Sequence, residues 1–151
     1  MLDDFDRALL RRLQAEPTLT HAELADLLGV ASARVTRRLG RLQEEGLIRG
    51  LRAVIDWKAL GYSVEVSLRM TLEKSVPGAF EAFLAAAREV PEVIEIQTFL
   101  GRVDVRLGVI ARDLAHYQEL YRDRILTLPH IADIEALMTV ARVKEEEALP
   151  L

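Results

Sequence analysis

The 151-residue sequence contains no cysteine, which excludes disulfide bonds and thiolate ligands for a metal. Its three histidines are scattered along the chain without the spacing of a metal site, so we expect neither a metal nor a cofactor. It has no apolar run of about 18 residues, the least that a membrane-spanning helix needs. The N-terminus begins acidic, unlike the basic and then apolar start of a signal peptide. We therefore expect a cytoplasmic protein with no membrane partner.

Charge is distributed unevenly, although the formal net charge is only −4. Residues 61–151 hold 15 acidic and 10 basic side chains, whereas residues 30–52 hold six arginines against two glutamates. Contact with phosphate depends on such a local basic face more than on the total charge. Half of the residues are apolar, enough for a sizeable core in one medium or two small domains. The basic stretch is therefore the part of the chain that suits a nucleic-acid partner.

Residues 20–49 predict two helices joined by a tight turn. Thr20 can cap the first of them, with Glu23 three residues later completing a capping box. Gly29 stands where that helix must end, because glycine tolerates a positive φ without strain. A second helix follows from about Ser32 to Glu45, and its apolar side chains fall at helical spacing on one face. That apolar stripe consists of Val35, Leu39 and Leu42.

The second helix also carries a stripe of arginines. Arg34, Arg37, Arg38 and Arg41 fall at i, i+3, i+4 and i+7, about a quarter turn from the apolar stripe. By itself such a face is most often a solvated surface, but after a short helix and a glycine turn it is typical of a helix-turn-helix reader of double-stranded DNA. The second half of residues 47–56 is a short β-like run, which we interpret as a wing. Arg49 and Arg52 are available there for phosphates.

The rest of the chain predicts a second domain. With a first helix from Asp3 to Gln14, residues 1–55 make one winged helix-turn-helix domain, residues 56–61 a linker, and residues 62–151 the other domain. Its hydrophobic patterns predict strands over 62–72, 93–100, 105–110 and 134–143, and helices over 77–90 and 113–126. The order βαββαβ is ferredoxin-like, so the whole chain is of the α+β class. Both helices would cover one sheet face, and we expect a second copy to cover the other, giving a homodimer.

Four motifs in this order resemble those of the Lrp/AsnC family of bacterial and archaeal transcription regulators. They are LDDFDRALLRRLQ, ELADLLGVASARVTRRLGRLQEEGLIRG, the turn from Gly101 to Asp104, and LTLPHIADIEALMTVARVK. The resemblance covers essentially the full length. It implies a winged helix-turn-helix domain, an ACT-like ligand-sensing and oligomerisation domain, and dimers that often assemble into an octamer. It also implies an amino-acid effector bound between sensing domains.

The resemblance carries over residue by residue. The implied DNA-binding residues of the second helix are Arg34, Thr36, Arg37, Arg38 and Arg41. The implied effector-binding residues are Gly101, Arg102, Val103, Asp104, Leu137, Met138 and Thr139.

The turn at Gly101 departs from the family pattern. Where the family usually has Gly-Asp-Tyr-Asp or Gly-Asp-Phe-Asp, this chain has Arg102 and Val103 in the middle, and His130 stands where a glycine is frequent. Arg102 adds a positive charge that suits a carboxylate, so we expect an effector other than the usual apolar amino acid. Asp104 has two interpretations, as a structural residue of the turn or as a ligand for an α-amino group.

Two alternatives to a ligand-responsive regulator remain. One is an architectural protein that wraps DNA without an effector, which the altered turn favours. The other is an enzyme similar to the tetrapyrrole decarboxylases of this architecture, but the segment QTFLGRVDVRLGV contains none of the histidines that those enzymes use. No Ser/His/Asp set, paired-carboxylate site or phosphate loop is present either, so we expect no catalytic residues.

Overall fold

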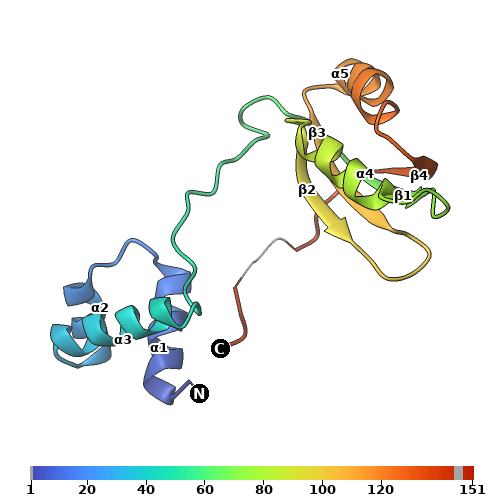
Figure 1. The fold of residues 1–151 in the computed structure, drawn as a ribbon. Coiled ribbons are helices and arrows are strands. Elements are labelled where there is room, and N and C mark those ends of the chain that lie inside the picture. Colours follow the sequence, from blue (N-terminus) through green and yellow to red (C-terminus); the bar gives the residue numbers. More distant parts are fainter. Residues whose placement is uncertain (1, 145–147) are drawn as a thin grey trace. The chain divides into compact units, whose positions relative to one another are not determined.

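The computed structural model describes residues 2–144 and 148–151, and these form two compact units (Figure 1). The first unit contains residues 2–54 together with 144 and 148–151, and the second contains residues 55–143. The sequence predicted one domain over residues 62–151, whereas the contacts of residues 148–151 lie in the first unit. None of the described helices is long and apolar enough to cross a membrane.

The first unit contains the three predicted helices, α1 (Asp4–Ala15), α2 (His21–Leu28) and α3 (Ser32–Glu44). The predicted capping box of α2 is present, because Thr20 Oγ1 accepts the Glu23 N–H and Glu23 accepts the Thr20 N–H. Gly29 ends α2 with φ 64°, the left-handed conformation that its position required. The turn between α2 and α3 therefore has the geometry that the sequence predicted.

The core of the first unit lies between the three helices. The apolar stripe of α3 is buried as predicted, and it packs with α1 and α2. The fully or almost fully buried residues of this core are Leu9, Leu24, Ala25, Val35, Leu39 and Leu42.

The β-like run after α3 is not a strand. No strand is present in the described segment between α3 and residue 64. Leu51 and Val54 are 71% and 87% exposed. An isolated strand lacks the hydrogen-bond partner that would hold it, and alternating apolar residues alone do not supply one. The prediction of a strand in the wing is therefore wrong for this structure.

The second unit has the predicted βαββαβ order. Its elements are β1 (Val64–Leu72), α4 (Ala79–Arg88), β2 (Val93–Thr98), β3 (Val105–Ala111), α5 (Leu114–Leu120) and β4 (Ile131–Met138). The strands form an antiparallel sheet in the order β2-β3-β1-β4. Side chains of α4 and of α5 share one core with the alternate residues of β1 and β3, so both helices cover the same face of the sheet (Figure 1). The ferredoxin-like fold is confirmed.

The largest differences from the prediction in the second unit concern the fourth strand and the last helix. The fourth strand spans Ile131–Met138 instead of 134–143, because its last ladder pair joins Met138 to Val66 near the start of β1. Only the Thr139 N–H continues this pairing, by donating to the Glu65 carbonyl at 2.9 Å. Val140 and Val143 are fully exposed. The last helix continues beyond Leu120 as a π-helical turn over Tyr121–Ile125, a change of hydrogen-bond pattern that periodicity does not reveal.

The face of the sheet opposite the helices is polar. Arg106 of β3 donates to Gln97 and pairs with Glu95 on β2, at 2.9 and 2.5 Å. Arg69 of β1 pairs with Glu135 of β4 at 3.6 Å. In each of these cross-strand pairs the two opposite charges compensate one another within the face. A layer that covers this face therefore meets charged side chains that already have partners.

Candidate nucleic-acid interface and ligand pocket

Two of the four arginines on α3 are held by a buried carboxylate from α1. Asp6 is fully buried, and its Oδ1 accepts from Arg38 Nη1 at 2.9 Å. Arg41 Nη2 pairs with the other oxygen, Oδ2. Because an unpaired buried carboxylate is costly, the two guanidinium groups are needed where they lie. They therefore anchor α3 to α1.

The Asp6 carboxylate also takes part in the N-terminal cap of α1. Asp3 and Asp6 form a capping box, in which the Asp6 N–H donates to Asp3 Oδ1 at 2.8 Å and the Asp3 N–H to Asp6 Oδ2 at 3.1 Å. Arg38 reaches Asp3 as well, at 2.6 Å. The hydrogen bond from the Asp6 N–H, and then the Arg38 side chain, lower the pKa of Asp3 below its ordinary value. The hydrogen bond with Asp3 and the charge of Asp6 in turn raise the pKa of Arg38.

Arg34 contacts α1 through an aromatic ring. Its guanidinium carbon lies 4.4 Å from the centroid of the Phe5 ring, within the range of a cation–π interaction. Arg34, Arg38 and Arg41 thus each have a partner on α1. The sequence showed one arginine stripe, but it did not show that residues more than 25 positions earlier would face three of its members.

The outward face of α3 contains Arg37 between two small residues. Ala33, Arg37 and Gly40 follow one another at i, i+4 and i+7, opposite the buried stripe of Val35, Leu39 and Leu42. A Cβ added at Gly40 would meet no atom within 4 Å. Arg37 is exposed, and no hydrogen bond or ion pair of its side chain occurs among residues 2–144 and 148–151. This face is open to close approach by a ligand.

The N-terminus of α3 lies beside the same face. Its N-cap, Ala31, provides no side-chain hydrogen bond, so the first amides of the helix have no side-chain cap. His21 Nδ1 lies 2.9 Å from Thr36 Oγ1 and links the start of α2 to α3. An uncapped helix N-terminus favours an anion such as a phosphate.

The chain leaves α3 through a glycine turn. Gly46 has φ 71°, and the N–H groups of Gly46 and Leu47 donate to the carbonyls of Gln43 and Leu42, which makes a Schellman motif. Arg49 and Arg52 follow in an extended, exposed segment. The structure therefore places both of these predicted phosphate contacts beyond the end of the candidate reading helix.

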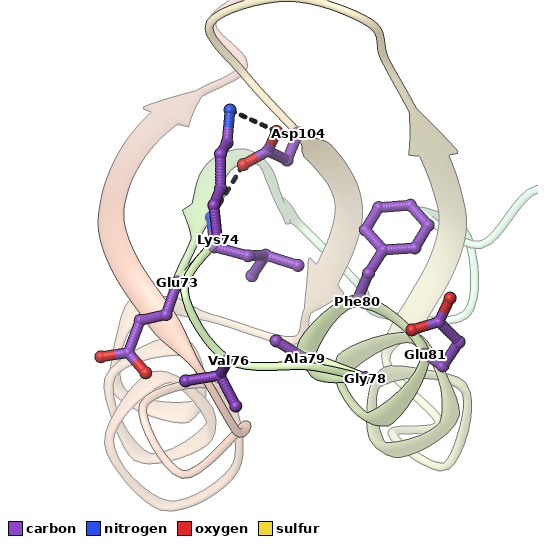
Figure 2. Close-up of a pocket in the computed structure, with 9 residues that line it drawn as sticks. Glu73, Lys74, Val76, Gly78, Ala79, Phe80, Glu81 and Asp104 are labelled. Atoms are coloured by element: carbon purple, nitrogen blue, oxygen red, sulfur yellow. Dashed lines mark hydrogen bonds and ion pairs between the residues drawn. The ribbon is translucent and has the colours of Figure 1, made fainter.

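The turn at residues 101–104 lies beside a pocket of about 260 Å3 (Figure 2). The pocket is formed by the end of β1, the loop after it and the first turn of α4, with Asp104 at one side. Its lining residues are Leu72, Glu73, Lys74, Val76, Gly78, Ala79, Phe80, Glu81 and Asp104. Of the predicted effector residues only Asp104 lines it, and nothing in the sequence pattern pointed to Lys74 or Phe80.

Asp104 has the structural role that was one of its two interpretations. Its Oδ2 accepts the Leu72 N–H at 2.9 Å, where the pairing of β1 with β4 shifts register after Thr71. Its Oδ1 lies 3.3 Å from Lys74 Nζ (Figure 2). The carboxylate thus compensates a backbone amide that the shifted ladder leaves without its regular partner. Arg102 is exposed, and its carbonyl accepts from Thr71 at 3.3 Å.

The two groups of predicted effector residues lie at opposite ends of the sheet. Met138 pairs with Val66, whereas Asp104 bonds to Leu72, six residues further along β1. At about 3.3 Å per residue this is a separation of roughly 20 Å. Leu137, Met138 and Thr139 therefore do not meet the Gly101–Asp104 turn within one chain. No group of three or more metal-ligating side chains occurs in the described part of the chain.

Two family models match the chain, one after the other along the sequence. Residues 2–49 match the family model described as "Winged helix-turn-helix DNA-binding", and residues 65–149 match the model described as "Lrp/AsnC ligand binding domain". The chain is 34% identical to a proline dehydrogenase transcriptional activator of Rhodobacter capsulatus, over 98% of this chain and 96% of that protein. It is 30% identical to a leucine-responsive regulatory protein of Rhizobium meliloti, over 95% and 92%.

A solved structure shows the same architecture. A transcriptional regulator of Neisseria meningitidis in complex with L-methionine superposes with a TM-score of 0.91 at 25% identity, over 99% of this chain and 97% of that one. The similarity thus extends over both units and not over a shared module alone.

Proposed function

The chain belongs to the Lrp/AsnC family of DNA-binding transcriptional regulators, and from this premise we propose which of its side chains contact DNA and where an effector binds. The members of this family are regulators, so the chain is a regulator with a ligand-binding domain and not an enzyme.

We propose that α3 enters the major groove with the face that contains Arg37. The observation that carries this proposal is the division of the arginines, since Arg34, Arg38 and Arg41 contact α1 while Arg37 has no such partner in the described chain. Ala33 and Gly40 leave room for a base pair beside it. Arginine can bind O6 and N7 of guanine together. Thr36 and the uncapped start of α3 suit the neighbouring phosphates.

Arg38 and Arg41 then have a positioning role. They hold the angle of α3 against α1 through Asp6, and their partly exposed outer edges remain near the groove. Arg49 and Arg52 contact phosphates beyond the reading helix. A homodimer formed over the polar sheet face presents two such units to a palindromic site, and further association of dimers gives the octamer that the family resemblance implies.

We also propose that the effector is an amino acid bound at the pocket beside Asp104. The relatives include a leucine-responsive protein and a complex with L-methionine. The pocket offers carboxylates of Asp104 and Glu81 for an ammonium group, and Lys74 and the uncapped first turn of α4 for a carboxylate. Val76 and Phe80 offer apolar surface to a side chain. Leu137, Met138 and Thr139 reach this site only from a second copy.

Fluorescence anisotropy on DNA from the protein's own upstream region tests the proposal. Arg37→Ala is expected to weaken binding by about 1–3 kcal/mol, or roughly 5- to 150-fold, as for the loss of a base contact. Arg88→Ala, on the exposed side of α4, is the matched control that also removes one positive charge. Equal affinities of the two variants would contradict the assignment of Arg37.

The same titration repeated with each common amino acid tests the effector. A shift in affinity with one amino acid, lost in Lys74→Ala, supports the pocket. Tight binding that is indifferent to all of them would instead favour an effector-independent architectural role, which the substitution of Arg102 and Val103 into the turn makes the second candidate.

A further inference from the structure

A groove on the first unit is lined in part by residues from the far end of the sequence. It lies between α1 and the segment that follows α3, with a volume of about 710 Å3. Leucines dominate its wall, and Leu149 and Leu151 are among them. The lining residues are Leu2, Leu10, Leu13, Gln14, Leu47, Ile48, Arg49, Gly50, Leu51, Arg52, Leu149 and Leu151.

The contact is specific at the backbone of the docked segment. The Leu149 N–H donates to Gln14 Oε1 at 2.5 Å, and Gln14 Nε2 donates back to the Leu149 carbonyl at 3.4 Å. One glutamine amide thus pairs with both polar groups of one residue, as a neighbouring strand would. Arg11 Nη1 donates to the Leu151 carbonyl at 3.0 Å.

The segment is shaped for this contact. The Leu151 N–H donates to the Leu149 carbonyl at 2.9 Å and closes a three-residue turn around Pro150. Proline fixes the φ angle that such a turn needs, so little conformational freedom is lost when the segment docks.

We propose that this groove is a recognition site for the chain's own segment Leu149–Leu151, which acts as a clasp between α1 and the segment after α3. The DNA-binding unit is then connected to the rest of the chain in two ways, covalently through residues 55–63 and non-covalently through the clasp. Leucine side chains make the apolar part of the contact. The hydrogen bonds of Gln14 and Arg11 determine where along the groove the segment lies.

Paramagnetic relaxation in the full-length chain tests the clasp. Because the protein has no cysteine, Ala148→Cys gives a single attachment site for a nitroxide label. Docking predicts strong broadening of the amide signals of residues 10–14 and 47–52 compared with a diamagnetic label. Gln14→Leu, which keeps a good helix former, and the paired Leu149→Ser and Leu151→Ser change are each expected to remove most of that broadening.

Two outcomes would overturn the proposal. One is broadening that is absent, or that persists unchanged in both variants. The other is broadening of an isotope-labelled chain by a nitroxide on a separate, unlabelled chain, which would assign the groove to the segment of a second copy. A circular dichroism spectrum identical to that of the unchanged protein shows that the variants are folded, and the measurement requires no DNA or effector.

Discussion

Asp6 in the first unit and Asp104 in the second both position a functional segment, but they act on different partners. Asp6 binds the guanidinium groups of Arg38 and Arg41 and so fixes α3 through side chains. Asp104 binds the Leu72 N–H and Lys74 and so fixes the pocket through the backbone. Side-chain anchoring depends on three residues being present together, whereas backbone anchoring depends only on the carboxylate. We expect the first arrangement to contribute more stability, because two charge-assisted bonds to a buried carboxylate outweigh one bond to a neutral amide. It can also be disrupted by substitution at more positions.

Removal of Asp6 is the most severe test of this comparison. Asp6→Ala deletes both ion pairs and half of the capping box, and we expect the first unit to lose about 2–4 kcal/mol of stability. Hydrogen exchange of the slowest amides in α1 and α3 measures this loss directly. The matched control is Asp4→Ala, an exposed acidic residue in the same helical turn, for which the change should stay within about 0.5 kcal/mol. Comparable losses in the two variants would mean that the buried pairs contribute little.

Removal of Asp104 should cost less. Asp104→Ala leaves the Leu72 N–H without its acceptor, which we expect to cost about 1–2 kcal/mol in the second unit. The ion pair with Lys74 adds little, because that lysine is largely exposed. The exchange rate of the Leu72 amide should rise strongly, while the amides of α3 stay unchanged. An unaltered Leu72 amide would remove Asp104 from its structural role.

A substitution of His130, which lies near the Asp104 anchor, is expected to increase the stability of the second unit. It has φ 64°, a conformation that is strained for any residue with a Cβ, and its carbonyl accepts the Glu73 N–H beside the pocket. His130→Gly keeps that hydrogen bond and should stabilise the second unit by about 0.5–1 kcal/mol. His130→Ala keeps the strain and should bring no such gain. Thermal unfolding of the two variants side by side separates backbone strain from loss of the imidazole.

The smallest expected effect is on the pH dependence of the stability of the first unit, and it tests the contacts around Asp6. The pKa of Asp3 is lowered by the hydrogen bond from the Asp6 N–H and then by Arg38. A lowered folded-state pKa gives stability that is complete above the unfolded value of 3.8 and is lost as the pH falls through the folded value. Stability of the first unit should therefore decline in this acidic range, and less steeply in Asp3→Asn. Parallel pH profiles for the two proteins would contradict the coupling.

The sequence was sufficient for the order of the elements and for most of both cores. Phe80 and Leu114 have the helical spacing of core residues, but they are 38% and 52% exposed. Helical spacing identified the buried stripe of α3, and alternation identified the inward residues of β1, because these patterns report local periodicity. Periodicity carries no information about which distant side chain will face an arginine. The contact of Asp6 with Arg38 spans 32 residues, and no local pattern predicts it.

Local sequence patterns also could not predict where the effector residues lie relative to one another. Leu137 and Asp104 belong to motifs that the family resemblance joins, yet the register of β1 with β4 puts them at opposite ends of the sheet. Register depends on pairing between strands far apart in the sequence, so it became visible only in the structure. The same holds for the pocket beside Asp104, which is assembled from a strand end, a loop and a helix start.

Because Asp6 both caps α1 and anchors α3, its position has a consequence for the divergence of related sequences. A change to asparagine would keep a capping side chain but remove the charge that two guanidinium groups share. Residue 6 therefore should not drift alone, and the acidic side chain should be gained or lost together with the arginines at 38 and 41. Arg37 is under no such constraint from the fold, so the proposed role of Arg37 in base recognition predicts that position 37 varies independently of position 6.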